Sequence, residues 1–173
     1  MTFAPRTWSV GETVTAVYMN TEIRDQFTSM FAAWSLWSPT WLAEGGAAPT
    51  LGNGQLVGRY LKVGRTVDWA LQLTWGSTTA AGGGGGGENW MFGLPAVPAT
   101  GFSFRTANFD AFKGSPVSLH YSATGVYNTG NGGVVKTIVS NRADASGIWD
   151  STLPFVYAAG DVLYGWGRYE AAA

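Results

Sequence analysis

The chain of 173 residues holds few side chains of the kinds that carry out chemistry on a substrate. Its only histidine is His120, and it has no cysteine. His120 lies in Val117–Ala123, where polar and apolar residues alternate, and the alternation places it on the polar face with Ser118 and Ser122. A catalytic histidine needs a positioned nucleophile and an orienting acid, and the sequence around His120 indicates neither. We therefore interpret His120 as a surface residue.

Two acidic residues, Asp144 and Asp150, fall in one predicted loop. Paired carboxylates serve glycosidases, and carboxylates also bind calcium. This loop lacks the regularly spaced oxygen ligands of an EF-hand, and acidic residues in loops are commonly solvated or cap turns. We expect no catalytic residue, no cofactor and no metal site, and therefore a protein that is not an enzyme.

An unbroken run of six glycines, Gly82–Gly87, formally satisfies the dinucleotide-binding pattern G-x-G-x-x-G. In that motif the glycines must open a helix within a βαβ unit. Here they precede Glu88–Leu94, which we interpret as a strand closed by Pro95. We reject nucleotide binding and predict a surface loop. The alternative is a tip loop that adapts to a ligand.

Aromatic side chains are the residues best suited to binding a ligand, and nine of them are tryptophans. Trp69 and Trp75 belong to the core by alternation. Trp90 and Trp149 lie near strand ends or loops, where an indole can stack its apolar face on a sugar ring. We name these two as candidate contacts to a sugar ligand. The alternative for each is packing in the core or at a subunit interface.

The elements that position these residues are mainly strands. Val67–Trp75 has apolar side chains at every second position, which is typical of a strand with one buried face. Val57–Val63 precedes it as a second strand, and Gly64 suits the tight turn between them. About seven or eight strands punctuated by Gly and Pro predict an antiparallel β-sandwich, jelly-roll-like, preceded by one helix. The expected domains are residues 1–36, an arm and helix for attachment and oligomerisation, and residues 37–173, the sandwich.

The last predicted strand, Val162–Tyr169, carries Gly165 and Gly167 in alternation with Tyr164 and Trp166. Glycine in a strand leaves space for an aromatic ring from a neighbouring strand to lie over the backbone. The pattern therefore predicts close aromatic packing against this strand.

One helix is predicted, from Ala16 to about Trp34, with Thr15 as its N-cap. Its apolar residues recur at the spacing of a coiled-coil seam, and a lone polar residue in such a seam can fix register or subunit number. The predicted oligomer interface consists of Asn20, Ile23, Phe27, Met30 and Trp34. We expect a homotrimer built around it. The alternative is an amphipathic helix that packs on its own β-domain.

Hydrophobic residues make up 46% of the chain and charged residues only 12%, with a net charge of −1. This low charge offers no electrostatic attraction for nucleic acid or for an anionic membrane. No apolar run reaches the roughly 20 residues of a membrane span. We expect neither nucleic acid nor a membrane as a partner. The surface must be rich in small polar residues or partly covered by other subunits.

Two segments resemble virion proteins of bacteriophages that infect actinobacteria. The first is TWSVGETVTAVYMNTEIRDQF, with a Trp, a V-G-E, a V-T helix start and an M-N-T-x-I-R-D core. The second is SPTWLAEGGAAPTLGNGQLVGRYLKVGRTVDWALQLTWGSTT, with P-T-W, L-G-N-G, G-R-Y and L-T-x-G-S-T-T. The first is similar to an N-terminal signature of those phages' structural proteins. The second is similar to a C-terminal β-module of tail fibre and minor tail proteins.

The resemblance implies a place in the particle rather than a reaction. We expect a non-enzymatic virion structural protein exposed on the particle surface, in the first place a tail-associated host-surface binding or fibre protein. The alternatives are a capsid decoration or head fibre protein and a carbohydrate-active depolymerase. The expected partners are further copies of the chain, other virion proteins and a host-surface glycan, and the expected location is the virion.

Overall fold

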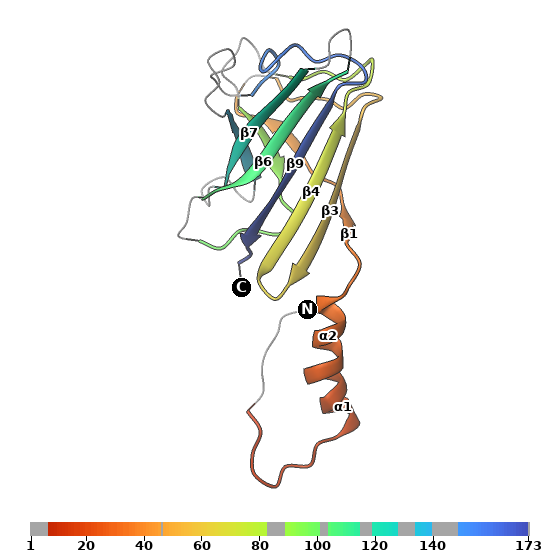
Figure 1. Cartoon of the computed structure of the whole chain (residues 1–173), viewed down its shortest axis with the longest axis vertical. Helices are drawn as coiled ribbons and strands as arrows, with labels where there is room; N and C mark the ends of the chain where they lie inside the picture. The colour runs from red at the N-terminus through yellow and green to blue at the C-terminus, as the bar shows by residue number, and fades with distance from the viewer. Residues whose placement is uncertain are drawn as a thin grey trace.

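The computed structural model describes residues 7–45, 47–82, 89–100, 104–114, 119–127, 134–139 and 149–172. Figure 1 shows a β-domain with one helical segment below it. Two features discussed above, Asp144 and Gly83–Gly87 of the glycine run, lie outside the described residues.

The helical segment has three consecutive parts, α1 (Ala16–Met19), the π-helical turn η1 (Asn20–Arg24) and α2 (Asp25–Met30). The strands of the described residues are β1 (Ser35–Trp37), β2 (Trp41–Ala43), β3 (Gln55–Val63), β4 (Thr66–Thr74), β5 (Trp90–Gly93), β6 (Phe104–Lys113), β7 (Leu119–Tyr127), β8 (Val134–Val139) and β9 (Val162–Glu170). All pairings between these strands are antiparallel.

The strands are hydrogen-bonded side by side in the order β1-β3-β4-β9-β6-β7-β8-β5-β2. The sheet curls, so that β5 faces strands that are not its neighbours in this order. Phe92 of β5 stacks on Phe109 of β6 with ring centroids 5.7 Å apart, and Trp90 of β5 lies 5.5 Å from Trp75 just after β4. The core fills the space between these layers. The predicted fold class is confirmed: the chain is mainly antiparallel β, sandwich-like, and preceded by one helix.

The predicted central hairpin is confirmed as well. β3 and β4 pair over their whole length, from Gln55 opposite Thr74 to Val63 opposite Thr66. Gly64 in the turn has a φ of 59°, in the left-handed region that favours glycine. Every second side chain from Val67 to Trp75 is buried, so the alternation in the sequence does mark the core face of β4.

Three neighbouring strands meet around one aromatic ring. Phe109 of β6 is fully buried and lies against Gly125 of β7 and Gly165 of β9. A Cβ atom added to Gly165 would stand 2.6 Å from Cε1 of Phe109, and one added to Gly125 would stand 2.6 Å from its Cε2. The predicted packing of an aromatic ring over the last strand is therefore confirmed at Gly165. At the edge of the sheet, Trp37 of β1 covers Gly58 of β3 in the same manner.

The helix is shorter than the sequence predicts. It begins at Ala16, where Oγ1 of Thr15 accepts a hydrogen bond from the N–H of Tyr18, and it ends at Met30 rather than at Trp34. The reason is tertiary: the chain must straighten to reach β1, which pairs with β3. Such pairing overrides a local helical preference. The β-domain accordingly begins at Ser35, before the expected boundary at 37.

The helical segment does not cover the β-domain. No described side chain within it is buried, and Figure 1 shows it standing below the sheet. The alternative in which this helix packs on its own β-domain is therefore wrong. In the part of the chain that the structure describes, no helix is both long and apolar enough to cross a membrane.

Candidate binding site

His120 and Asp150, which were considered above for catalysis, take part in ring packing and in a turn. His120 is exposed, as predicted, and its ring centroid lies 5.2 Å from that of Phe112. Asp150 is buried and caps a turn. Its Oδ1 accepts hydrogen bonds from the N–H and the hydroxyl of Thr152, at 2.6 and 2.8 Å, and from the N–H of Leu153 at 2.9 Å. Within the described residues there is no group of three or more His, Asp or Glu side chains that could hold a metal ion.

The two tryptophans named as candidate glycan contacts are buried, so that prediction is wrong. Trp90 is 1% exposed and Trp149 is 0% exposed. The ring of Trp90 lies 5.4 Å from that of Trp41, and its Nε1–H donates to the carbonyl of Ala81 at 3.3 Å. Tyr157, from the segment before β9, closes this end of the core at 5.2 Å from Trp90. A position near a strand end does not reveal that a distant segment covers it.

Tyr157 is a partly buried titratable residue at this end of the domain, and its hydroxyl group is enclosed by the protein. Its ring stacks on Trp75 with centroids 4.1 Å apart. Burial raises the pKa of Tyr157 well above its usual value, and the negative charges of Asp161 and Asp150 raise it further. Asp161 is also buried, and its carboxylate accepts hydrogen bonds from the N–H groups of Ala158 (2.8 Å) and Gly114 (3.0 Å). The hydrogen bonds to Asp161 fix the loop before β9.

Tyr169 gives a prediction for alkaline pH. Its hydroxyl donates to the carbonyl of Ala96 (2.7 Å) and accepts from the N–H of Ala96 (2.9 Å), and burial raises its pKa to about 12. An unfolded tyrosine titrates near about 10, so the folded protein holds more protons between these two values. Its contribution to stability is complete below pH 10 and is lost as the pH rises toward 12. Urea unfolding between pH 9 and pH 12 should therefore show a shallower loss of stability for Tyr169→Phe than for the wild type. Parallel curves would contradict this assignment.

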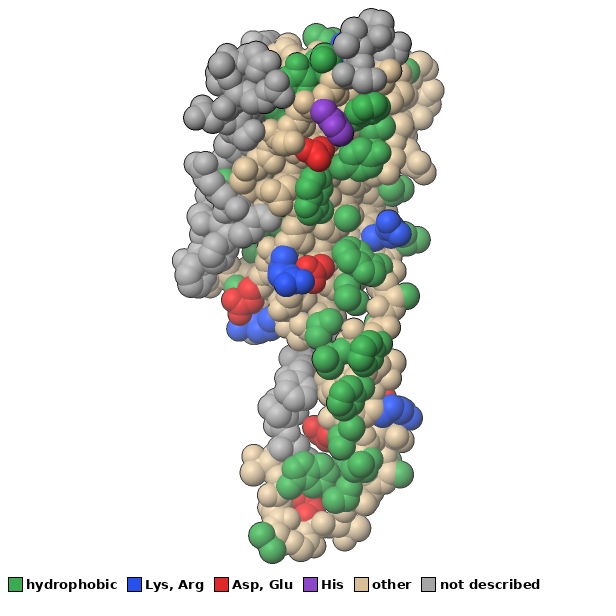
Figure 2. All heavy atoms as spheres, viewed as in Figure 1, with side chains coloured by type: hydrophobic (Ala, Val, Ile, Leu, Met, Phe, Trp, Pro, Cys, Tyr) green, Lys and Arg blue, Asp and Glu red, His purple; other side chains and the backbone are tan. Residues whose placement is uncertain are grey.

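The outer face of the long strands is the second surface of interest. Residues in register form rows across it, and one row runs across six strands through Leu36, Arg59, Ala70, Trp166, Asn108 and Thr124. An adjacent row contains Asp68 and Arg168, and the row on the other side contains Gln72 and Tyr164. Figure 2 shows apolar side chains along this face, mixed with single charged groups and no broad patch of one sign.

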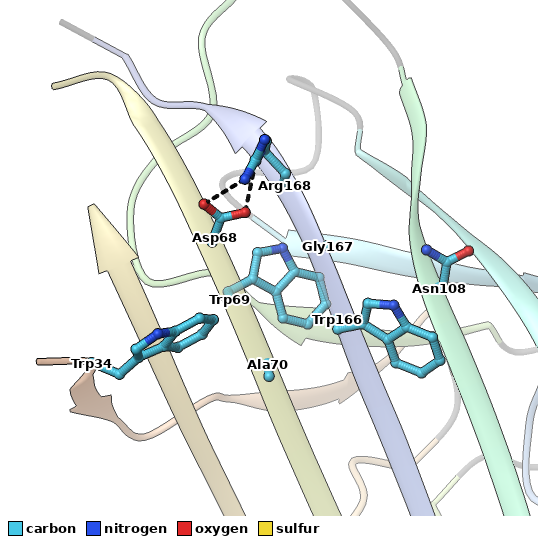
Figure 3. A pocket seen from close by; sticks show the side chains of 8 residues that line it. All are labelled: Trp34, Asp68, Trp69, Ala70, Asn108, Trp166, Gly167 and Arg168. Carbon is cyan, nitrogen blue, oxygen red and sulfur yellow. Dashed lines mark hydrogen bonds and ion pairs between the residues drawn. The ribbon is translucent and has the colours of Figure 1, made fainter. Parts of the chain in front are cut away.

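An open hollow of about 590 Å³ lies on this face. Figure 3 shows the rings of Trp34 and Trp166 on either side of Ala70; the ring of Trp69, seen between them in this view, is buried on the core face of β4. Trp34 is 46% exposed and Trp166 is 41% exposed. Asp68 and Arg168 form one wall and Asn108 lies beyond Trp166. Trp34 was predicted in the helical seam, but it lines this hollow instead because the helix ends before it.

Two further hollows adjoin the first. One of about 580 Å³ is lined by Trp34, Arg59 and Ala70, and one of about 370 Å³ includes Ala70 and Tyr164. Ala70 lines all three, so they meet around this residue on the outer face of β3, β4 and β9. Neither Trp166 nor Tyr164 was predicted as a binding residue. Their alternation with Gly165 and Gly167 was the signal, because it places the two aromatic residues together on the face opposite the glycines.

The charged groups of the hollow form one ion pair. Nε of Arg168 donates to Oδ1 of Asp68 at 2.7 Å, and Nη2 donates to Oδ2 at 3.1 Å. This hydrogen bonding and the charge of Asp68 raise the pKa of Arg168. Asp68 is the only carboxylate among the described residues that line the three hollows. Glycoside hydrolysis needs two carboxyl groups about 5–9.5 Å apart. The arrangement suits binding and does not supply the acid–base pair of a depolymerase.

Comparison of the chain with protein-family models, with curated proteins and with solved structures finds no match. Function is therefore argued from the fold, the helical segment and the outer face of the sheet.

Proposed function

We propose that this protein is a non-enzymatic structural component of a bacteriophage virion, exposed on the particle surface and assembled through its N-terminal helix. In this proposal the β-domain projects outward as a tail-associated host-surface binding or fibre protein. The single observation that carries the proposal is the helical segment. It stands away from a folded β-domain while its large apolar side chains remain exposed.

Three residues of the predicted interface support assembly through the helix. Ile23 is 43% exposed, Phe27 is 56% exposed and Met30 is 51% exposed. Their spacing of four and three residues is that of a coiled-coil seam, and Figure 2 shows apolar side chains along the segment. A helix whose apolar stripe stays exposed beside its own β-domain gains its stability from packing against other helices. Further copies of the chain supply such partners.

The other two predicted interface residues lie differently. Asn20 is exposed and begins the π-helical turn η1, which interrupts the α-helical spacing between Asn20 and Phe27; Ile23 lies near the end of the same turn. Trp34 lies beyond the helix end, on the outer face of the sheet. The proposed interface is therefore centred on Ile23, Phe27 and Met30.

Replacing these three residues with serine is expected to convert a trimer into single chains of 18.3 kDa, as measured by light scattering during gel filtration. The matched control replaces Thr21, Arg24 and Thr28, which are also exposed on the helical segment, with serine. This control should keep the trimer, since it removes similar helix propensity and none of the apolar stripe. A wild-type chain that is a monomer at micromolar concentration contradicts assembly through the helix.

The place in the particle is tested separately, by gold-labelled antibodies against the β-domain on particles of the phage that encodes the chain. Labelling at the tail supports the leading proposal. Labelling over the whole head supports the capsid decoration or head fibre alternative, and a reconstruction would then show hundreds of copies rather than a few. Particles without any label contradict a surface position.

A further inference from the structure

The hollow between Trp34 and Trp166 is lined both by exposed aromatic rings and by polar side chains. Each indole is partly exposed, so each offers an aromatic platform at the hollow. Between them the floor is Ala70 and the sheet backbone, with no long side chain to move aside. An aromatic platform of this kind binds the apolar face of a ring-shaped ligand.

Polar groups surround the two tryptophan rings and limit which classes of ligand can bind between them. Asp68 and Arg168 neutralise each other through two hydrogen bonds, and Asn108 and Gln72 are uncharged neighbours on the same face. The hollow between Trp34 and Trp166 therefore has no net charge with which to attract a phosphate, a carboxylate or an ammonium group. Arg59, which is exposed and lines the two adjoining hollows, adds one guanidinium group that can donate hydrogen bonds to sugar hydroxyl groups. A ligand that fits the hollow has apolar C–H faces, hydroxyl groups at its rim and no net charge. Neutral pyranose and furanose sugars meet all three conditions.

The arrangement of the hollows favours an extended ligand. The volumes of about 590, 580 and 370 Å³ each lie within the range of ligand sites, about 300–1,000 Å³. They adjoin at Ala70, and each has an aromatic ring in its lining: Trp34 and Trp166 in the first, Trp34 in the second and Tyr164 in the third. A chain of repeating sugar units presents one ring after another at such a series of sites. A protein partner would instead need an apolar segment that protrudes into every hollow.

We propose that this outer face is a binding site for a neutral oligosaccharide, with Trp166 and Trp34 stacking on sugar rings and Asn108 and the Asp68–Arg168 pair contacting hydroxyl groups. The inference rests on the proposed function, since it names the class of ligand for the host-surface role. It also relocates the glycan site from the buried Trp90 and Trp149 to the exposed sheet face.

The test is calorimetric titration of the full chain with neutral tetrasaccharides of glucose, mannose, galactose, xylose and arabinose. At least one should bind in a saturable manner, and Trp166→Ala should weaken that binding by about tenfold or more. The matched control is Trp8→Ala: Trp8 is 42% exposed, against 41% for Trp166, and lies on the N-terminal arm beside Tyr18. It should leave the affinity unchanged. Asn108→Ala, on the surface of β6, provides a second variant that should weaken binding if Trp166→Ala folds poorly.

Three results would overturn the proposal: no saturable binding of any tetrasaccharide, equal weakening by Trp8→Ala and Trp166→Ala, or loss of the oligomer in Trp166→Ala. The last would mean that a second copy of the chain covers this face. Binding by purified protein is independent of antibody labelling on particles. Absence of sugar binding would therefore not contradict the position on the virion surface. Particles without antibody label would not contradict the sugar site.

Discussion

Replacing Trp69 with alanine is expected to lower the free energy of unfolding by about 3–5 kcal/mol, the range for removing a large buried aromatic side chain. Trp69 is fully buried on β4 and lies at the centre of the aromatic core. Its ring contacts those of Trp37 at 6.1 Å and Phe109 at 6.2 Å. Its Nε1–H donates to the hydroxyl of Tyr127 at 2.7 Å, so alanine leaves a cavity and also removes a buried hydrogen bond.

The control for this experiment is Gln72→Ala on the same strand. Gln72 points to the outer face, where its side-chain amide donates to the hydroxyl of Thr74 on the same strand at 3.2 Å. Its replacement should change stability by less than about 0.5 kcal/mol. Urea unfolding of both variants decides the matter, and equal losses would contradict the division of β4 into a core face and an outer face.

Replacing Phe109 with alanine should cost a similar amount, about 3–5 kcal/mol, and should reverse the effect of a second substitution. In the wild type, Gly165→Ala brings a new methyl group to 2.6 Å from the ring of Phe109, and overpacking of this kind costs about 1–3 kcal/mol. In the Phe109→Ala background the ring is absent and the same methyl group fills part of the cavity. Gly165→Ala is then expected to be neutral or stabilising.

A double-mutant cycle measured by denaturant unfolding gives this coupling directly. The control is Gly114→Ala, because a Cβ atom there would meet no atom closer than 3.9 Å. Its effect should be small and the same in both backgrounds. Additive effects of Phe109→Ala and Gly165→Ala would show that the ring does not depend on the glycine beneath it.

The sequence allows the β-domain to be predicted better than the position of its binding residues. In β4 the buried side chains alternate without interruption, and Gly64 marks the turn, so local pattern and tertiary structure agree there. Gly165 also indicates close packing, since glycine in a strand leaves space for a neighbouring aromatic ring to lie over the backbone. These features depend on local periodicity, which a sequence displays directly.

Residues whose positions depend on distant segments could not be placed in this way. Trp149 is buried although it precedes a loop, and Trp90 is closed in by Tyr157, which comes much later in the chain. Trp34 continues the helical spacing of Phe27 and Met30, yet pairing between β1 and β3 draws it out of the helix. In each case a contact between segments far apart in the sequence determines where the tryptophan lies. The local sequence pattern does not indicate that contact.

The small side chain of Ala70 affects how the outer face of the sheet can change by mutation. Its side chain points away from the core and lines all three hollows. A longer side chain there would occupy the space between Trp34 and Trp166 without touching the packing inside the sheet. Alanine codons become valine or glutamate codons by a single base change. Descendants of this chain can therefore lose or reshape the sheet face in one mutational step while the fold is inherited unchanged.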